Sequence, residues 1–258
     1  MKKILFICKK YQFLFEELVK RDFKQKYKRS ILGMGWSILS PLLSLLVMYM
    51  VFSRMFGNRM EHYVIYLFSG QLVLSYYKES TKNGMTSLVN NSKIFTKINV
   101  PKYMFLLSKN VSALVNFGLT LLVYFVFCVF DGIVFHPRQF LLLFPILCLL
   151  LLNIGVGLIL SAMFVFFRDV RYLYDVMLTL LTYVSAIFYS VDSFTPTGQR
   201  LFLLNPIYVY IKYFRTIMID CKIPSIQYHL LCTFYALIFL VIGGYIYKKN
   251  NHAFLYYL

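Results

Sequence analysis

The chain has 258 residues, of which 60% are hydrophobic and only 14% are charged, with a net charge of +17 and a mean hydropathy of +0.67. A soluble domain carries about 25% charged residues, and no polar stretch in this sequence is long enough to form one. The apolar residues stand in long blocks instead of the stripes of one-sided helices or strands. The composition therefore excludes a soluble globular protein and predicts an all-α membrane protein.

Six segments are apolar enough to be interpreted as membrane-crossing helices, for which about 20 apolar residues are needed. They lie at 38–56, 63–77, 105–130, 140–167, 173–189 and 230–247. We expect residues 31–258 to form one six-helix transmembrane domain.

The Lys and Arg residues divide unequally between the two sides of such a domain. An even number of spans puts both termini on one side, and that side then holds 20 of the 27 Lys and Arg residues. Because these residues accumulate on the cytoplasmic side, we predict a multi-pass protein of the cytoplasmic (inner) membrane with both termini in the cytoplasm. The same rule explains the positive charge without a nucleic-acid partner.

The first 30 residues are too highly charged to span a membrane, and they contain no signal-peptide cleavage site. As a helix they would gather apolar residues on one face and charged residues on the other; the apolar face comprises Ile4, Ile7, Cys8, Tyr11, Leu14, Phe15 and Leu18. A helix with a basic polar side lies in the headgroup plane, on the leaflet whose anionic lipid attracts it. We predict a cytoplasmic amphipathic interfacial helix over residues 1–30. A plain charge cluster that sets topology is the alternative, since Phe13 falls off the apolar face.

Two connections between the spans carry structure of their own. Residues Ser87–Ile98 favour either a short helix that docks on a partner or a continuation of the second span. Residues 191–227 are semi-apolar, and irregular backbone at membrane depth is tolerated only beside protein or a water-filled cavity. We therefore expect a partly re-entrant outward hairpin around Asn205–Pro206.

Catalytic and nucleotide-binding motifs are missing from the sequence. It has no GxxxxGK[ST] phosphate loop, no HExxH and no GxSxG. The five cysteines form no CxxC pair, so we expect small apolar fillers and no metal site. No charged residue is expected deep in a span, so a proton- or sodium-coupled relay lacks its parts. These absences predict a conduit or scaffold that is not an enzyme, holds no cofactor and draws any energy from another subunit.

Three stretches and one dipeptide resemble a known family. Residues 21–41, RDFKQKYKRSILGMGWSILSP, are similar to the signature of type-2 ABC (ABC-2) transporter permeases that export polysaccharides and polyol-phosphate polymers, such as O-antigen or teichoic acid. NNSKIFTKINVPKY (90–103), FFRDV (166–170) and the Asn205–Pro206 pair resemble further motifs of that family, in the same order. The sequence departs from the family at 74–77, which lacks a Trp-Phe pair, and at 185–189, which lacks a proline.

The resemblance implies a permease subunit that works as a homodimer, grips two copies of a cytoplasmic ABC ATPase and moves a lipid-linked polysaccharide or teichoic-acid-like polymer. It implies coupling or interface roles for Arg21, Asp22, Lys24, Tyr27, Ser30, Ser87, Asn90, Lys93, Lys97, Pro101, Arg168 and Asp169. It implies structural roles for Gly33, Trp36, Pro41, Asn205 and Pro206.

Other interpretations stay open at this point. The neighbouring pairs Arg21–Asp22 and Arg168–Asp169 could anchor helix ends by ion pairs, or they could reflect ordinary snorkelling. The many Tyr and Phe rings could line a pore along which a glycan slides, or form interfacial belts. The chain could also be an ABC-2 permease for a drug or small lipid, or a non-transporting membrane scaffold or enzyme.

Overall fold

The computed structural model describes residues 2–28, 30–57, 61–95, 97 and 100–257, with the side chains of these residues except 2–10, 27 and 255. Within these ranges the elements are helices and short connections, without a strand, so the predicted all-α class is confirmed. Four helical segments are long and apolar enough to cross a membrane: Gly33–Phe56, Tyr103–Phe130, Pro137–Phe166 and Ile226–Asn250. They coincide with four of the six predicted spans.

The other two predicted spans lie on α3 (Tyr63–Asn90) and α7 (Val170–Val184). In the described ranges, neither helix is among the four segments that are long and apolar enough to cross a membrane. The polar second half of α3 and the 15-residue length of α7 explain this outcome. The six-span count therefore stays a prediction.

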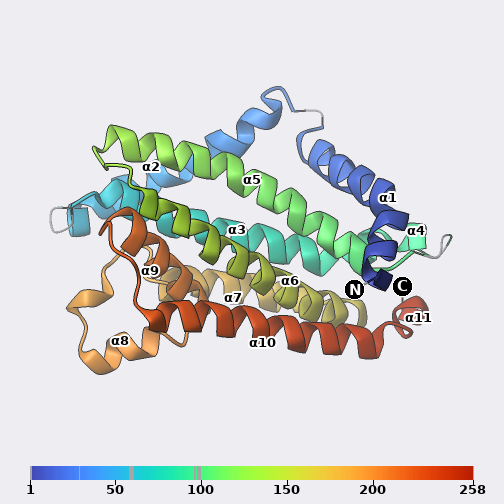
Figure 1. Ribbon diagram of the computed structural model, residues 1–258. Coiled ribbons are helices and arrows are strands. Elements are labelled where there is room, and N and C mark those ends of the chain that lie inside the picture. Colours follow the sequence, from blue (N-terminus) through green and yellow to red (C-terminus); the bar gives the residue numbers. More distant parts are fainter. Residues whose placement is uncertain (1, 29, 58–60, 96, 98–99, 258) are drawn as a thin grey trace.

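The long helices run side by side along the molecule (Figure 1). They are α2 (Trp36–Phe56), α3, α5 (Tyr103–Phe130), α6 (Leu143–Phe166) and α10 (Ile226–Asn250). Both chain termini lie at one end of this bundle, together with α4 (Ser92–Phe95) and α11 (Phe254–Tyr257). The short helices α8 (Pro196–Phe202) and α9 (Pro206–Met218) lie at the opposite end.

Glycines let α6 approach two neighbouring helices closely. A Cβ atom on Gly155 would lie 2.4 Å from the carbonyl carbon of Phe239, and one on Gly243 would lie 2.3 Å from the carbonyl oxygen of Gly155. Gly157 faces Gly84 of α3 in the same way, with 3.3 Å between a Cβ on Gly84 and the Cα of Gly157. Small residues at such crossings are the usual device for packing helices in a membrane.

Replacing Gly155 with alanine is expected to destabilise the bundle, because α6 and α10 must then move apart. Overpacking of this kind costs about 1–3 kcal/mol. Gly244→Ala is the matched control, because a Cβ at that position of α10 meets nothing within 4 Å. Thermal unfolding of the two purified variants tests the contact. Equal midpoints for Gly155→Ala and Gly244→Ala would contradict it.

The N-terminal segment is one long helix, α1 (Lys2–Tyr27). Among its described side chains, Leu18 is only 4% exposed and packs on the bundle, whereas Phe13, which falls off the predicted apolar face, is 77% exposed. Glu16, Glu17 and Lys20 lie on the exposed side. The amphipathic pattern is thus present, while the place of α1 in a headgroup layer stays a prediction.

The connection after the second predicted span is mostly helical. α3 continues to Asn90, so the first part of the segment that was expected to be a separate connection belongs to α3. The four-residue helix α4 follows directly. α3 therefore takes in the first part of Ser87–Ile98 and a separate short helix the next. Docking of that short helix on a partner stays a prediction, and Ile98 lies outside the described residues.

The fifth predicted span is too long at its C-terminal end. α7 stops at Val184, and Ala186 adopts a left-handed φ of 51°, which ends a helix even without a proline at this point. The chain then forms η4 (Val191–Ser193), α8 and α9. The expected helical pair around Asn205–Pro206 is present, and its insertion into a bilayer stays a prediction.

Candidate functional site

A buried carboxylate on α1 forms the centre of a charged cluster at the end of the molecule that carries the termini. The side chain of Asp22 is 2% exposed and lies 2.9 Å from the nitrogens of both Arg21 and Lys109. The hydroxyl of Ser108 donates to its other oxygen at 3.0 Å. Lys109 and Ser108 belong to α5, so Asp22 attaches α1 to α5 by charge and by hydrogen bond.

Arg21 extends this cluster to the end of α3. Its guanidinium donates to Oδ1 of Asn91 at 2.8 Å, and Nδ2 of Asn91 donates to the carbonyl of Ser87 at 2.8 Å. Three elements that are distant in sequence therefore meet at one pair of charges. We call Arg21, Asp22, Asn91, Ser108 and Lys109 the junction cluster.

Sequence reasoning found only part of the junction cluster. It selected Arg21 and Asp22, and it selected Asn90 in place of Asn91; Asn90 is exposed at the end of α3, whereas Asn91 is 3% exposed. Lys109 and Ser108 carried no signal, because one Lys and one Ser at the start of an apolar helix are also what positive-inside charge and ordinary packing would give.

The remaining predicted interface residues lie around this cluster on the surface. Lys24, Lys93 and Lys97 are exposed, and Pro101 lies two residues before the start of α5. The side chain of Tyr27 lies outside the described residues. Lys93, Lys97 and Pro101 lie near one another in sequence, whereas Lys24 lies on α1.

The expected Arg168–Asp169 ion pair is not among the ion pairs of the described residues. The guanidinium carbon of Arg168 lies 5.1 Å from the centre of the Phe164 ring, and Asp169 is the residue preceding α7, where its carbonyl accepts from the backbone of Tyr172 at 3.0 Å. Both side chains are exposed, so the pair is free to meet a partner and does not anchor a helix end here.

Lys102, which the sequence did not single out, ties the start of α5 to the C-terminal segment. Its ammonium donates to the carbonyl of Asn251 and lies 5.9 Å and 5.7 Å from the ring centres of Phe95 and Phe254. Burial lowers the pKa of Lys102 below its ordinary value. The contact joins α4, α5 and α11 at the end where α1 also lies.

A cavity of about 420 Å³ lies where the chain turns from α1 into α2. We call it the elbow cavity. It is bounded on one side by the segment from Lys26 to Ser44 and on the other by α3 and α5. Its lining includes Trp36, Ser40, Gln71, Ser75, Tyr76 and Asn116. Six residues of the family-like stretch 21–41 line it, namely Lys26, Ser30, Trp36, Ser37, Ser40 and Pro41, whereas Gly33 adopts a left-handed φ of 50° in the turn.

A chain of hydrogen bonds crosses the wall of the elbow cavity. Lys26 forms an ion pair with Glu79 at 2.7 Å, and the same carboxylate oxygen accepts from Nδ2 of Asn116 at 2.7 Å. The hydroxyl of Ser37 lies 3.4 Å from Oδ1 of Asn116. These contacts link α1, α3, α5 and α2 in turn.

Pro41 adds a second link, because proline inside a helix leaves the carbonyl of the residue four positions earlier without its usual donor. That carbonyl belongs to Ser37, and the hydroxyl of Thr120 lies 3.5 Å from it. The carbonyl of Pro41 accepts from Nε2 of Gln71 at 3.2 Å. The proline of the signature therefore fixes α2 to α3 and α5 by exposing its backbone.

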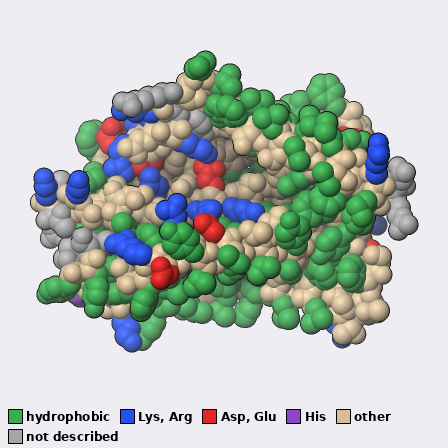
Figure 2. All heavy atoms as spheres, turned by 180° about the vertical axis from the view of Figure 1, so that it is seen from behind, with side chains coloured by type: hydrophobic (Ala, Val, Ile, Leu, Met, Phe, Trp, Pro, Cys, Tyr) green, Lys and Arg blue, Asp and Glu red, His purple; other side chains and the backbone are tan. Residues whose placement is uncertain are grey.

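Charged side chains also line the face of α3 that lies towards α7. Lys82 forms an ion pair with Asp175 at 2.7 Å, and Lys78 donates to Thr182 at 2.7 Å. Figure 2 shows Lys, Arg, Asp and Glu side chains gathered towards the middle of one face, between green areas of hydrophobic side chains.

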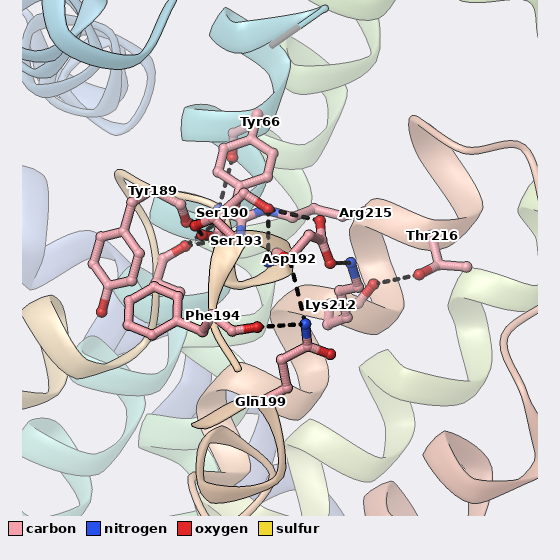
Figure 3. A network of polar contacts seen from close by, with 11 residues as sticks. Tyr66, Tyr189, Ser190, Asp192, Ser193, Phe194, Gln199, Lys212, Arg215 and Thr216 are labelled. Atoms are coloured by element: carbon pink, nitrogen blue, oxygen red, sulfur yellow. Dashed lines mark hydrogen bonds and ion pairs between the residues drawn. The ribbon is translucent and has the colours of Figure 1, made fainter. Parts of the chain in front are cut away.

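The hairpin at the far end is held by a buried arginine that sequence reasoning assigned to an outer connection. Arg215 of α9 is 4% exposed. It donates to the carbonyls of Ala186 at 2.8 Å, Ile187 at 3.1 Å and Tyr66 at 3.1 Å, and its guanidinium stacks 3.4 Å from the centre of the Tyr66 ring (Figure 3). One side chain thus joins the irregular segment that follows α7 to the first turn of α3.

The residues around Arg215 complete the hairpin. Tyr66 donates to the carbonyl of Tyr189 at 2.7 Å, and Asp192 pairs with Lys212 at 3.3 Å (Figure 3). Asn205 accepts from the backbone nitrogen of Ile207 at 3.0 Å and donates to Ser185 at 3.0 Å. The predicted structural pair Asn205–Pro206 therefore begins α9 and connects it to the end of α7.

Comparison with known proteins places these features in a family. A family model described as ABC-2 type transporter matches residues 14–219. The O-antigen export system permease protein RfbA of Myxococcus xanthus is 26% identical over 221 residues, which cover 84% of each chain. Two proteins of the same name from Klebsiella pneumoniae are 25% identical and cover 94% of this chain and 95% of their own length. Because the family match runs from α1 through α9 and takes in the junction cluster, the elbow cavity and the hairpin, the chain belongs to the ABC-2 type transporter family.

Proposed function

We propose that this chain is the permease subunit of an ATP-driven exporter that carries a lipid-linked polysaccharide or teichoic-acid-like polymer across the cytoplasmic membrane. Two copies of the chain would form the passage, and two copies of an ABC ATPase would supply the energy. The names of the relatives, which are O-antigen export permeases, support a polysaccharide as the cargo.

The observation that carries the proposal is a polar stripe along α3. Ser75, Lys78, Glu79 and Lys82 follow one another at the spacing of a single helix face. The helices α2 and α7 expose large apolar side chains, among them Leu46, Val47, Leu173 and Val176. A charged stripe that faces lipid is costly. If a second copy packs against the apolar faces of α2 and α7, the polar stripes of the two copies would face a shared aqueous passage instead of lipid.

The junction cluster supplies a physical basis for partner-driven motion. It joins α1 to α5 and to the end of α3, at the end of the molecule where exposed Lys93, Lys97 and Arg168 also lie. A force applied there by an ATPase would pass to the bundle through a buried ion pair and not through a flexible loop. We assign Arg21 and Asp22 as coupling residues on this basis.

The proposal includes six spans with both termini in the cytoplasm, with α3 and α7 completing the set. Because green fluorescent protein folds to its fluorescent form in the cytoplasm but not after unfolded export, a C-terminal fusion is expected to fluoresce. A fluorescent fusion placed after residue 139, in the connection before α6, is expected to stay dark. The reverse pattern would contradict the orientation.

Deletion of the gene tests the cargo. Cells that lack the chain are expected to lose the polymer from their surface and to accumulate it inside in lipid-linked form, and the gene supplied in trans is expected to restore it. Surface polymer can be measured with an antibody or lectin on intact cells, and internal polymer after lysis. Normal surface polymer in the deletion strain would contradict the proposal.

A further inference from the structure

The elbow cavity differs from its surroundings in having hydrogen-bonding walls. On α2, Ser37, Ser40 and Ser44 line it, whereas Leu43 and Leu46 of the same helix do not line it and are exposed and apolar. From α3 come Gln71 and Ser75, and from α5 comes Asn116. Phe68 and Leu72 add apolar surface to the wall, so the cavity combines apolar area with hydroxyl and amide groups, whose burial without partners would cost free energy.

Two buried polar groups of residues that line the cavity, Oε1 of Gln71 and the hydroxyl of Tyr76, have no hydrogen-bond partner among the described residues. Gln71 is more than nine-tenths buried, and its Nε2 is used by the carbonyl of Pro41, but its Oε1 accepts from no described donor. Buried polar groups are normally satisfied. Oε1 is itself buried, so the amide would have to turn towards the cavity for a ligand hydroxyl to supply the missing donor.

Aromatic rings complete the cavity. Trp36, the single Trp of the chain, lines it with 43% of its surface exposed. Tyr76 and Phe117 form a second aromatic surface, with ring centres 4.7 Å apart. Flat rings beside hydroxyl and amide groups suit a ligand that is apolar on its ring faces and polar at its edge, and a sugar ring has this character.

The charges of the wall argue for an uncharged ligand. Among the described residues, Lys26 and Glu79 are the charged side chains that line the cavity, and they neutralise each other at 2.7 Å. A phosphate group would have to compete with Glu79 for Lys26 in the same small space. The volume of about 420 Å³ lies within the range of small-molecule sites.

We infer that the elbow cavity binds a neutral sugar unit of the exported polymer, with the sugar ring on Trp36 and its hydroxyls on the Gln71, Ser75 and Asn116 side. The inference rests on the proposed function and sharpens it, since it selects a polysaccharide over a polyol-phosphate polymer. It also places the contact inside each copy of the chain, between the α1–α2 turn and the α3–α5 pair.

Protection of a thiol introduced by Ser75→Cys tests the site. Ser75 is exposed to the cavity, so this variant should fold. It is made in a chain whose five native cysteines are replaced and which still restores surface polymer to the deletion strain. Export is then stalled by mutating the catalytic lysine of the partner ATPase, and maleimide labelling is compared in membranes from cells that make the polymer and cells blocked in its first sugar transfer.

Stalled polymer is expected to slow labelling of the Ser75→Cys variant by about five-fold or more. This is the effect of one aromatic contact between the polymer and the cavity wall that is occupied most of the time. Lys20→Cys on the exposed side of α1 is the control and should label equally in both membranes. Equal labelling of Ser75→Cys with and without polymer would overturn the sugar site alone, since export by the same parent chain shows that the exporter works. Normal surface polymer without the chain would instead overturn the exporter.

Two further measurements decide the ligand class. Trp36→Phe, which keeps a flat ring, is expected to retain most export, whereas Trp36→Ala is expected to lower it by about five-fold or more at equal amounts of chain in the membrane. Equal export by the two variants would contradict stacking. Phosphate analysis of the purified surface polymer is expected to find a repeat unit without phosphate, and one phosphate per repeat would overturn the choice of a neutral polysaccharide.

Discussion

Replacing Asp22 with alanine is expected to lower export about ten-fold or more. A loss of this size corresponds to a coupling free energy within the usual range of about 1–3 kcal/mol. Among the described ion pairs, Asp22 is the only carboxylate that pairs with both Arg21 and Lys109. Its loss leaves Lys109, whose side chain is 17% exposed, facing Arg21 without a counter-ion. Breaking a buried pair in this way costs about 3–5 kcal/mol, and it releases α1 from α5.

The measurement is surface polymer on intact cells, scored together with the amount of chain in the membrane and the amount of ATPase that co-purifies with it. Asp22→Asn separates charge from hydrogen bonding, because an amide can still accept from Ser108 but cannot neutralise Lys109. The matched control is Glu17→Ala, which removes a carboxylate from the exposed 3.0 Å pair with Lys20 on the same helix. Exposed pairs contribute little, so this variant should export normally. Wild-type export by Asp22→Ala would remove Asp22 from the coupling path.

Replacing Arg215 with methionine is expected to have the second large effect, this time on folding. The change keeps an unbranched side chain but removes the guanidinium hydrogen bonds to the carbonyls of Ala186, Ile187 and Tyr66. The Tyr66 carbonyl keeps a bond from Ser69 at 2.9 Å, and among the described residues the Ala186 carbonyl keeps only the 3.5 Å contact with the Tyr66 hydroxyl. Each buried group that loses its partner costs about 1–3 kcal/mol, so the hairpin should separate from α3 and the chain should reach the membrane in much smaller amounts.

Arg200→Met is the matched control for this prediction, since Arg200 lies on α8 of the same hairpin and is exposed. Membrane levels by immunoblot and protease sensitivity of residues 185–225 report the outcome. Arg215→Lys should fall between wild type and Arg215→Met, because an ammonium has three donors but not the planar fork that reaches several carbonyls. Unchanged levels and protease resistance for Arg215→Met would show that the arginine does not hold the hairpin.

The sequence predicted those features that depend on local pattern. The apolar blocks predicted the four long spans to within a few residues, and the spacing of Leu14, Leu18 and their neighbours predicted the buried face of α1. The signature residues Arg21, Asp22, Ser30, Trp36 and Pro41, which the family resemblance alone indicates, lie in the junction cluster and the elbow cavity.

What the sequence could not predict depends on contacts between distant elements. The composition around Glu79 and Lys82 is that of a cytoplasmic connection. The structure instead continues α3 to Asn90, which places both residues on one face of a long helix. Arg215 resembles an ordinary outward charge, because nothing in its neighbourhood along the chain shows that Gly70 leaves room for it; a Cβ on Gly70 would lie 2.9 Å from its guanidinium nitrogen. Burial of a charge is a property of the packed bundle and has no signature in the local sequence.

The exporter is tested most directly by following the polymer across a membrane. Inverted vesicles are prepared from cells that make the polymer and contain the chain together with its ATPase, so that the cytoplasmic face is outside. Adding ATP is expected to move lipid-linked polymer into the lumen, where an added glycosidase cannot reach it, and vesicles with Asp22→Ala should show no such protection. If wild-type vesicles leave the polymer equally accessible with and without ATP, while the ATPase is bound and active, the chain is not the export permease proposed here.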